Sequence, residues 1–379
     1  MTATPTRPAP AATVRTAHFT RPLPLARGGT LPAQTLAYET YGSLNARRDN
    51  AVLVCHSLTK DAHAAGRRAP GERPGWWDAA IGPGRLLDTD RYFVVSSATL
   101  AAPGSTGPAT TDPSTGRPYG PRFPALTIGD MVDVQHRLVR SLGITRLAAV
   151  VGGCFGGQQA LQWALRYPGA VDRAVVIGVT PATSAHTIAL FTVMRRLIRS
   201  DPCYRGGDYY DGPPPVTGLG HAVAAAAPLW MSREALERRF GRRPAGPVPG
   251  AVNRAEFAVE EFLEHLADDA ATTIDPNSLL SLMRAEEYFD LAAEYGDVRT
   301  AMARVRAGTL FVSYRGDWRY PAEETDTMHT ALRAAGGRSR HVILDSPYGH
   351  GAFLFDVGPL ARHVAPFLDT PATAGQVPR

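Results

Sequence analysis

The chain has 379 residues, 44% hydrophobic and 20% charged, which suits one large α/β domain with a sizeable insertion. No signal-peptide core and no run of roughly 18 apolar residues is present, so we expect a cytoplasmic protein with no membrane partner. The net charge of +5 comes from dispersed arginines and a single lysine, Lys60, without a basic helix, which argues against a nucleic-acid partner.

The first half of the chain predicts alternating strands and helices between two tails. Residues 1–14 and 370–379 are polar or rich in Pro and Ala and are predicted to be disordered. The predicted elements, in chain order, are strands at 33–42, 51–57 and 91–98, a helix at 127–144, a strand at 146–153, a helix at 156–168 and a strand at 173–179. Thr127 and Asp130 form a capping pair at the start of the first helix.

The pattern changes at residue 181. Up to residue 300 the chain predicts helices without a convincing strand, at 186–198, 233–240, 255–267 and 278–295, separated by segments rich in Pro and Gly. Strands at 309–315 and 340–346 then alternate with helices at 323–336 and 359–368. We therefore predict an α/β core over 15–180 and 301–369, with a mostly parallel sheet covered by helices on both faces and a helical lid over 181–300.

The segment GGCFGG, residues 152–157, carries the strongest chemical signal. It lies between a strand and a helix and has the form G-x-C-x-G, a nucleophile elbow with sulfur in place of oxygen. Side chains at Gly152 and Gly156 would collide across so sharp a turn. The turn lifts the Cys154 sulfur to a helix N-terminus, where free N–H groups favour a thiolate and an oxyanion.

Two partners for Cys154 follow in the order expected of a nucleophile, acid and histidine triad. Asp317 comes after the strand at 309–315, and His350 comes after the strand at 340–346. We predict that His350 takes the thiol proton and that Asp317 orients the imidazole. The oxyanion donors are predicted to be the backbone N–H groups of Phe155 and Leu58.

Several segments resemble the homoserine O-acetyltransferase group of α/β-hydrolases. The similarity covers roughly residues 15–368 and rests on the elbow GGCFGGQQALQWALRYP together with CHSLTKDAHAAG, PGWWDAAIGPGRLLDTDRYFVV, GSTGPATTDPSTGRPYGPRFPALTIGDMV, DPNSLLSLMRAEEYFDLA and SPYGHGAFLFD. The resemblance implies ping-pong transfer of an acyl group from acyl-CoA, through an acyl-enzyme, to a hydroxyl. It also implies a tunnel formed by the lid, a homodimer built through the lid, and no cofactor apart from acyl-CoA as co-substrate.

The chain departs from that family at two positions. The family's serine nucleophile is Cys154 here, so the acyl-enzyme is a thioester that stays activated toward several kinds of acceptor. The aspartate that follows the histidine in homoserine enzymes, where it would meet the substrate ammonium, is Gly351. Arg196 aligns with the arginine that the family uses for the substrate carboxylate. Because an unpartnered ammonium is costly in a buried site, we expect an acceptor from specialised biosynthesis.

Alternative interpretations accompany these predictions. The enzyme could be a homoserine or serine O-acetyltransferase proper, a thioesterase on the same triad, or a binding protein that only keeps the fold. Thr59 and Lys60 join Arg196 and Gly351 as predicted substrate-binding residues. Lys60 is better explained, however, as a solvated loop residue paired with Asp61, and Arg196 could equally be a surface charge. No metal is expected, because no third ligand of the right type accompanies the histidines of the CHSLTKDAH segment.

Overall fold

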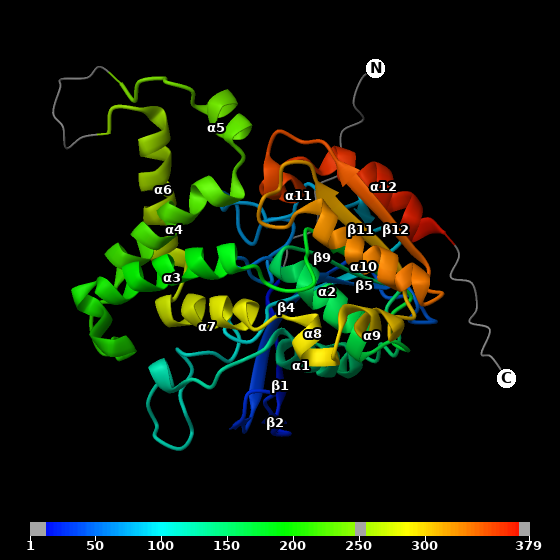
Figure 1. The fold of residues 1–379 in the computed structure, drawn as a ribbon. Coiled ribbons are helices and arrows are strands. Elements are labelled where there is room, and N and C mark those ends of the chain that lie inside the picture. Colours follow the sequence, from blue (N-terminus) through cyan, green and yellow to red (C-terminus); the bar gives the residue numbers. More distant parts are fainter. Residues whose placement is uncertain (1–12, 247–254, 371–379) are drawn as a thin grey trace.

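A computed structural model describes residues 13–246 and 255–370 (Figure 1). Its main sheet has eight strands in the order β1-β4-β8-β5-β9-β10-β11-β12. Strand β4 pairs antiparallel with both β1 and β8, whereas the strands from β8 to β12 run parallel. The strands are β1 (Arg15–Phe19), β4 (Gln34–Tyr41), β5 (Ala51–Cys55), β8 (Phe93–Ser97), β9 (Ala149–Gly153), β10 (Arg173–Ile177), β11 (Gly308–Tyr314) and β12 (Ser339–Leu344).

The central strands are buried along their whole length. Every residue of β5, β9 and β11 is buried, which explains their nearly continuous apolar runs. Helices pack around the sheet: α2 (Phe155–Arg166) contacts β5, β9 and β10, while α10 (Ala322–Ala334) and α12 (Val357–Asp369) contact β12. The predicted α/β-hydrolase architecture with a mostly parallel sheet is confirmed. The predicted disordered tails lie outside the described residues, apart from Thr13, Val14 and Thr370.

Local signals place several of these elements correctly. Helix α1 (Ile128–Ser141) begins with the predicted capping pair, since Thr127 accepts from the Asp130 N–H and Asp130 accepts from the Thr127 N–H. The remaining short elements are β2 (Leu23–Pro24), β3 (Thr30–Leu31), β6 (Ile81–Gly82), β7 (Leu87–Asp88), η1 (Gly120–Arg122), η2 (Pro202–Gly207), η3 (Gly349–Gly351), α8 (Leu291–Tyr295), α9 (Val298–Ala303) and α11 (Ala352–Phe355).

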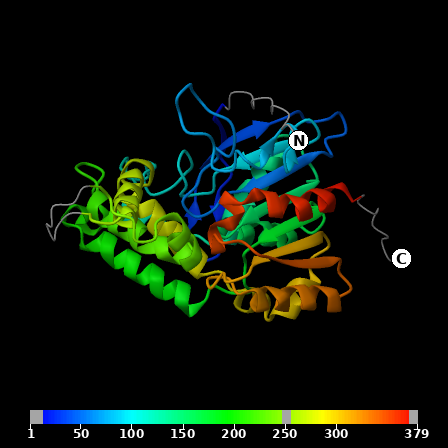
Figure 2. The same ribbon diagram turned by 90° about the horizontal axis from the view of Figure 1, so that it is seen from above.

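A block of helices between β10 and β11 lies beside the sheet rather than on one of its faces (Figures 1 and 2). It comprises α3 (Ala185–Ser200), α4 (Val216–Trp230), α5 (Arg233–Arg239), α6 (Ala258–Thr273) and α7 (Pro276–Glu287). Its own apolar core includes Phe191 and Ile198 of α3, Leu219 of α4 and Met283 of α7. Within the described ranges, no helix has both the length and the apolar character needed to cross a membrane.

Helix α4 is missing from the sequence-based prediction, although it packs extensively on α3 and α6. Its alanine-rich sequence shows no polar face, and it starts with a segment rich in Pro and Gly that signals a loop. The glycines serve close packing instead. A Cβ at Gly218 would lie 2.6 Å from the Leu197 carbonyl oxygen of α3, and one at Gly220 would lie 2.9 Å from the Ala267 Cβ of α6.

The helix predicted over residues 278–295 is also wrong in one respect, because the chain breaks it into α7 and α8. Helix α7 ends at Glu287, and Asp290 then caps α8 by accepting from the N–H groups of Ala292 and Ala293. The Leu291 N–H donates to the Pro181 carbonyl. The break therefore ties the end of α7 to the segment that leaves the sheet after β10.

Candidate active site

Cys154 occupies a strained turn between β9 and α2. Its φ of 59° and ψ of −127° fall in a region that side chains rarely adopt. A Cβ at Gly152 would lie 2.1 Å from the Gly156 carbonyl oxygen, and one at Gly156 would lie 2.1 Å from the Cys55 carbonyl oxygen. Both glycines are therefore required by backbone contact, and the turn holds the Cys154 sulfur at the carboxyl edge of the sheet.

Asp317 and His350 meet at the same edge. The His350 Nδ1 lies 2.8 Å from the Asp317 Oδ2, and both side chains are buried. The other carboxylate oxygen, Oδ1, accepts the backbone N–H groups of Arg319 at 3.0 Å and Tyr320 at 3.1 Å. This turn after β11 fixes the orientation of the carboxylate, and the carboxylate in turn fixes the imidazole. The structure thus brings together the three side chains predicted to form the triad.

The charges around Cys154 favour a thiolate facing an imidazolium. Burial alone would raise the pKa of the Cys154 thiol, but the Arg319 guanidinium and His350 outweigh it and lower this pKa below its ordinary value. For His350, burial acts to lower the pKa, while the Asp317 carboxylate and Cys154 raise it to about 10. Each partner therefore stabilises the charged form of the other.

Two further side chains contact the sulfur, a third binds both of them, and none of the three is in the sequence-based prediction. The Arg319 Nη1 lies 3.5 Å and the Tyr320 hydroxyl 3.6 Å from the Cys154 sulfur. Both donate to one carboxylate oxygen of Glu286 on α7, the Tyr320 hydroxyl at 2.7 Å. Arg319 and Tyr320 directly follow the predicted Asp317 loop, so adjacency was a usable signal. Nothing in the local pattern of α7 separates Glu286 from an ordinary helix carboxylate.

The two predicted oxyanion donors lie on elements next to the sulfur. Phe155 is the first residue of α2, so its N–H has no acceptor within the helix. Leu58 lies in the loop after β5, in a turn where the Lys60 N–H donates to the Ser57 carbonyl. Their role as oxyanion donors stays a prediction.

A cavity of about 510 Å³ opens beside this loop. Leu58, Thr59 and Lys60 line one wall, and the lid residues Tyr209 and Asp275 line another. Lys60 is half-buried, and within the described ranges it makes no ion pair with Asp61. Burial lowers the pKa of its ammonium, which the carboxylates of Asp269 and Asp61 oppose.

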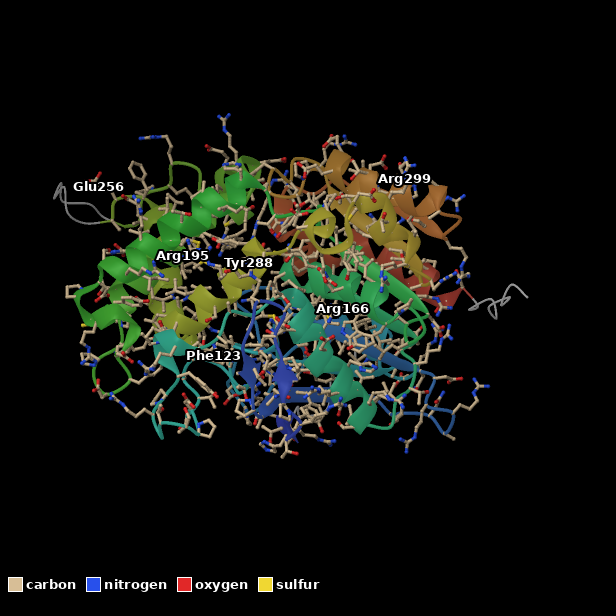
Figure 3. All side chains as sticks on the ribbon, turned by 60° about the horizontal axis from the view of Figure 1, so that its bottom comes forward. Phe123, Arg166, Arg195, Glu256, Tyr288 and Arg299 are labelled. Carbon is tan, nitrogen blue, oxygen red and sulfur yellow. The ribbon has the colours of Figure 1, made fainter. Side chains whose placement is uncertain are left out.

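The remaining predicted substrate residues, Arg196 and Gly351, are not among the residues that line this cavity. Arg196 is exposed on α3, whereas its neighbour Arg195 is buried and pairs with Glu287 of α7. Figure 3 labels Arg195 on α3 near the end of α7. Gly351 is buried next to His350, and a Cβ there would lie 3.1 Å from the Phe355 ring. The substrate roles of Thr59, Lys60, Arg196 and Gly351 stay predictions.

The histidines near the early loop have protein partners. The His56 Nδ1 lies 2.8 Å from the Ser57 carbonyl oxygen, and its Nε2 accepts the Thr99 N–H at 3.0 Å. The His63 Nδ1 lies 3.0 Å from a Glu39 carboxylate oxygen. In the part of the chain that the structure describes, no three His, Cys, Asp or Glu side chains gather as a metal site would require.

We expect iodoacetamide to alkylate Cys154 rapidly at neutral pH. A lowered pKa lets the thiol ionise at a lower pH than an ordinary cysteine, so the rate of alkylation should fall only as the pH drops through that lowered value. His350 should keep its proton until the pH approaches about 10. The rate at each cysteine is measured against pH by peptide mass spectrometry. Cys55 is the internal comparison, because burial raises the pKa of its thiol. A Cys154 rate that rises only at alkaline pH would contradict the expectation.

The parallel sheet, the strained turn at Cys154 and the acid–histidine pair at the carboxyl edge define an α/β-hydrolase. Accordingly, the family model for the alpha/beta hydrolase fold matches residues 50–356.

Comparison with individual proteins identifies the family more closely. The chain is 43% identical over 354 residues to the homoserine O-acetyltransferase of Solidesulfovibrio magneticus, covering 92% of this chain and 89% of that protein. It is 45% identical over 362 residues to the homoserine O-succinyltransferase of Litchfieldella anticariensis, covering 93% and 91%. The crystal structure of homoserine O-acetyltransferase from Bacillus anthracis matches with a TM-score of 0.89 at 28% identity, covering 97% and 100%. The chain belongs to the homoserine O-acyltransferase family.

Proposed function

We propose that this protein transfers a short acyl group, acetyl or succinyl, from acyl-CoA to the hydroxyl of homoserine through a thioester on Cys154. The observation that carries the proposal is the buried Cys154 sulfur, whose thiol pKa is lowered, beside the Asp317–His350 pair, in a chain whose relatives include both acetyl- and succinyltransferases at similar identity. The family membership replaces our expectation of an acceptor from specialised biosynthesis with its alternative, homoserine.

Acylation begins with attack of the Cys154 thiolate on the acyl carbonyl carbon. The carbonyl oxygen becomes an oxyanion that the N–H groups of Leu58 and Phe155 stabilise. The C–S bond to coenzyme A then breaks, and the protonated His350 gives its proton to the departing thiolate. The product is a thioester on Cys154 with a neutral imidazole beside it. Because one thioester replaces another, this step is nearly neutral in free energy and preserves the reactivity of the acyl group.

Deacylation runs the same chemistry toward the acceptor. The neutral His350 takes the proton of the acceptor hydroxyl while the oxygen attacks the thioester carbonyl. The Cys154 thiolate leaves, and the thiolate–imidazolium pair is restored. Asp317 stabilises the imidazolium that forms, and Arg319 stabilises the returning thiolate. Both half-reactions need no metal and no cofactor other than the acyl-CoA co-substrate.

Burial of the site supports transfer over the thioesterase alternative. Cys154 is 4% exposed, Asp317 4% and His350 6%, so bulk water has little access to the thioester. An acceptor that binds next to the sulfur would be held close to the thioester and would therefore react with it in preference to water. Catalysis without acceptor is therefore expected to be slow.

We also propose a homodimer in the cytoplasm, assembled through the lid. Support comes from α3, which exposes the apolar side chains of Ile188 and Val193 next to the exposed Arg196. Light scattering measures the mass directly, and a monomer at micromolar concentration would refute the dimer.

Intact-protein mass spectrometry tests the proposed reaction. The protein is mixed with acetyl-CoA or succinyl-CoA, and the mass of the adduct identifies the donor that is used. Homoserine is then added to the isolated acyl-enzyme, and we expect loss of the adduct together with appearance of the O-acyl amino acid. If acyl-CoA were consumed at a rate that homoserine does not change, the chain would be a thioesterase. The absence of any adduct would contradict both enzyme assignments.

A further inference from the structure

Glu286 is a fully buried carboxylate that is only half satisfied. Its Oε1 accepts from both Arg319 and Tyr320, the two side chains that also contact the Cys154 sulfur. Its Oε2 is buried and accepts no hydrogen bond from the described residues. A buried oxygen of a carboxylate without a donor is costly, and such groups are usually satisfied by a partner. The Glu286 Oε2 is therefore available to accept a hydrogen bond from a ligand that brings a donor.

A second unpaired acceptor lies next to Glu286. The Thr183 hydroxyl donates its proton to the Glu286 backbone carbonyl, so its oxygen is left to accept from the Gln158 Nε2 at 3.5 Å. This contact fixes the orientation of the Gln158 amide, whose Oε1 is buried and has no donor among the described residues. Gln158 lies one helical turn after Cys154, on α2. Among the described residues, two buried acceptor oxygens, the Glu286 Oε2 and the Gln158 Oε1, thus lack donors, while one buried donor, the Arg319 Nε, lacks an acceptor.

The charges of the cluster point to a cation. Once Cys154 is acylated, its sulfur is neutral, and His350 has lost its proton to the departing thiol. Asp317 and Glu286 then contribute two buried carboxylates against the single guanidinium of Arg319. A buried charge without a counter-charge is unfavourable. The same excess of one negative charge is present before acylation, because the Cys154 thiolate and the His350 imidazolium then offset each other. An ammonium group of the acceptor would compensate this excess in either state.

We infer that Glu286 binds the ammonium group of the acceptor, so that the enzyme selects alcohols that carry an amine a few bonds from the hydroxyl. The inference rests on the proposed function, whose acceptor homoserine has this chemistry. One phenol links the two ends of the site, because the Tyr320 hydroxyl contacts both the Cys154 sulfur and the Glu286 carboxylate. Gly351, beside the catalytic histidine, has no side chain to offer. Helix α7 of the lid thus supplies the carboxylate that would bind the ammonium group.

Binding of two acceptors that differ only in the amine tests this inference without requiring acyl transfer. The affinities of L-homoserine and 4-hydroxybutyrate are measured by calorimetry for the wild type, Glu286→Gln and Glu287→Gln. The glutamine keeps an oxygen for Arg319 and Tyr320 but replaces Oε2 with an N–H donor. We expect the wild type to prefer homoserine by about 10- to 100-fold, the range of a hydrogen bond to a charged group. The preference should collapse toward unity in Glu286→Gln.

Glu287→Gln is the matched control. Glu287 is the next residue of α7, and its side chain is nearly as buried (4% exposed), but it pairs with Arg195 and Arg284, away from the sulfur. This variant should keep the preference for homoserine. If Glu286→Gln failed to fold, the same two affinities would be measured for Glu286→Asp, and the preference of the wild type for homoserine would still test the inference. A wild type that binds both acceptors equally, or a preference that survives in Glu286→Gln, would overturn the inference. A Glu286-dependent preference without acyl transfer would uphold it and refute only the proposed reaction.

Discussion

Replacing Cys154 with alanine is expected to abolish the acyl-enzyme and to lower turnover by about 10⁶-fold, as removal of a nucleophile does in comparable triads. The reason is that Arg319, Tyr320 and His350 all act on the sulfur, so removing it leaves nothing for them to stabilise. Intact mass after exposure to acyl-CoA reports the adduct, and release of free coenzyme A reports turnover. Cys154→Ser should retain residual activity, because the turn that presents the side chain is unchanged.

Cys203→Ala provides the matched control for this experiment. Cys203 is a half-buried thiol of the lid, and its removal should leave both the adduct and the turnover intact. If Cys154→Ala still formed an adduct on acyl-CoA, the acyl group would reside elsewhere and the proposed mechanism would be wrong. If Cys154→Ser exceeded the wild type, the advantage that we assign to the thiolate–imidazolium pair would be refuted.

The core and the three central site residues were predictable because their signals are local. Buried parallel strands such as β9 read as short apolar runs, and the glycines around Cys154 follow from backbone contacts within a few residues. Asp317 and His350 lie just after late strands, and parallel strands bring their carboxyl ends to one edge. Sequence order therefore implied spatial proximity for these residues.

The surroundings of the sulfur could not be predicted in the same way. Glu286 reaches the site from α7, more than a hundred residues along the chain from Cys154, and only the packing of the lid determines which face of α7 turns inward. Helix α4 was missed because alanine-rich helices buried on two sides lack the polar face that marks a surface helix. Arg196 was chosen because it aligns with an arginine of the family, and that alignment did not indicate that its neighbour Arg195 is the buried one.

Gly351 is the reason why the sequence and the structure lead to different acceptors. The missing side chain there suggested that an ammonium would be unpartnered and that the acceptor was not homoserine. The structure places another carboxylate, Glu286, in contact with the Tyr320 hydroxyl that contacts the sulfur, and one Glu286 oxygen accepts no hydrogen bond from the described residues. A carboxylate at Glu286 could bind the same ammonium group that an aspartate at position 351 would bind, so a glycine at 351 is compatible with homoserine as the acceptor. The two observations together favour a relocated binding group over a new substrate class.

Asp317→Asn is expected to lower turnover by about 10⁴-fold, the loss seen when the acid of such a triad becomes an amide. Oδ1 of Asp317 accepts two backbone N–H groups, so an asparagine must keep its oxygen there and turn its NH₂ toward His350. The His350 Nδ1 would then have to accept, which places the ring proton on Nε2, facing the sulfur. That tautomer cannot take a proton from the thiol. The raised pKa of His350 would fall as well, because the carboxylate that raises it is gone.

The pH dependence of alkylation separates this explanation from simple destabilisation. In Asp317→Asn the Cys154 rate should rise only at more alkaline pH, because a neutral imidazole no longer lowers the thiol pKa. Asp326→Asn is the matched control: Asp326 contacts the His341 Nδ1 at 3.0 Å, but this acid–histidine pair is on α10 and β12, away from the sulfur. It should leave turnover and the alkylation profile unchanged. If the Asp317→Asn variant kept wild-type turnover, Asp317 would have no part in the mechanism. If the variant lost turnover but kept the wild-type pH dependence of alkylation, Asp317 would have a role other than stabilising the positive charge of His350.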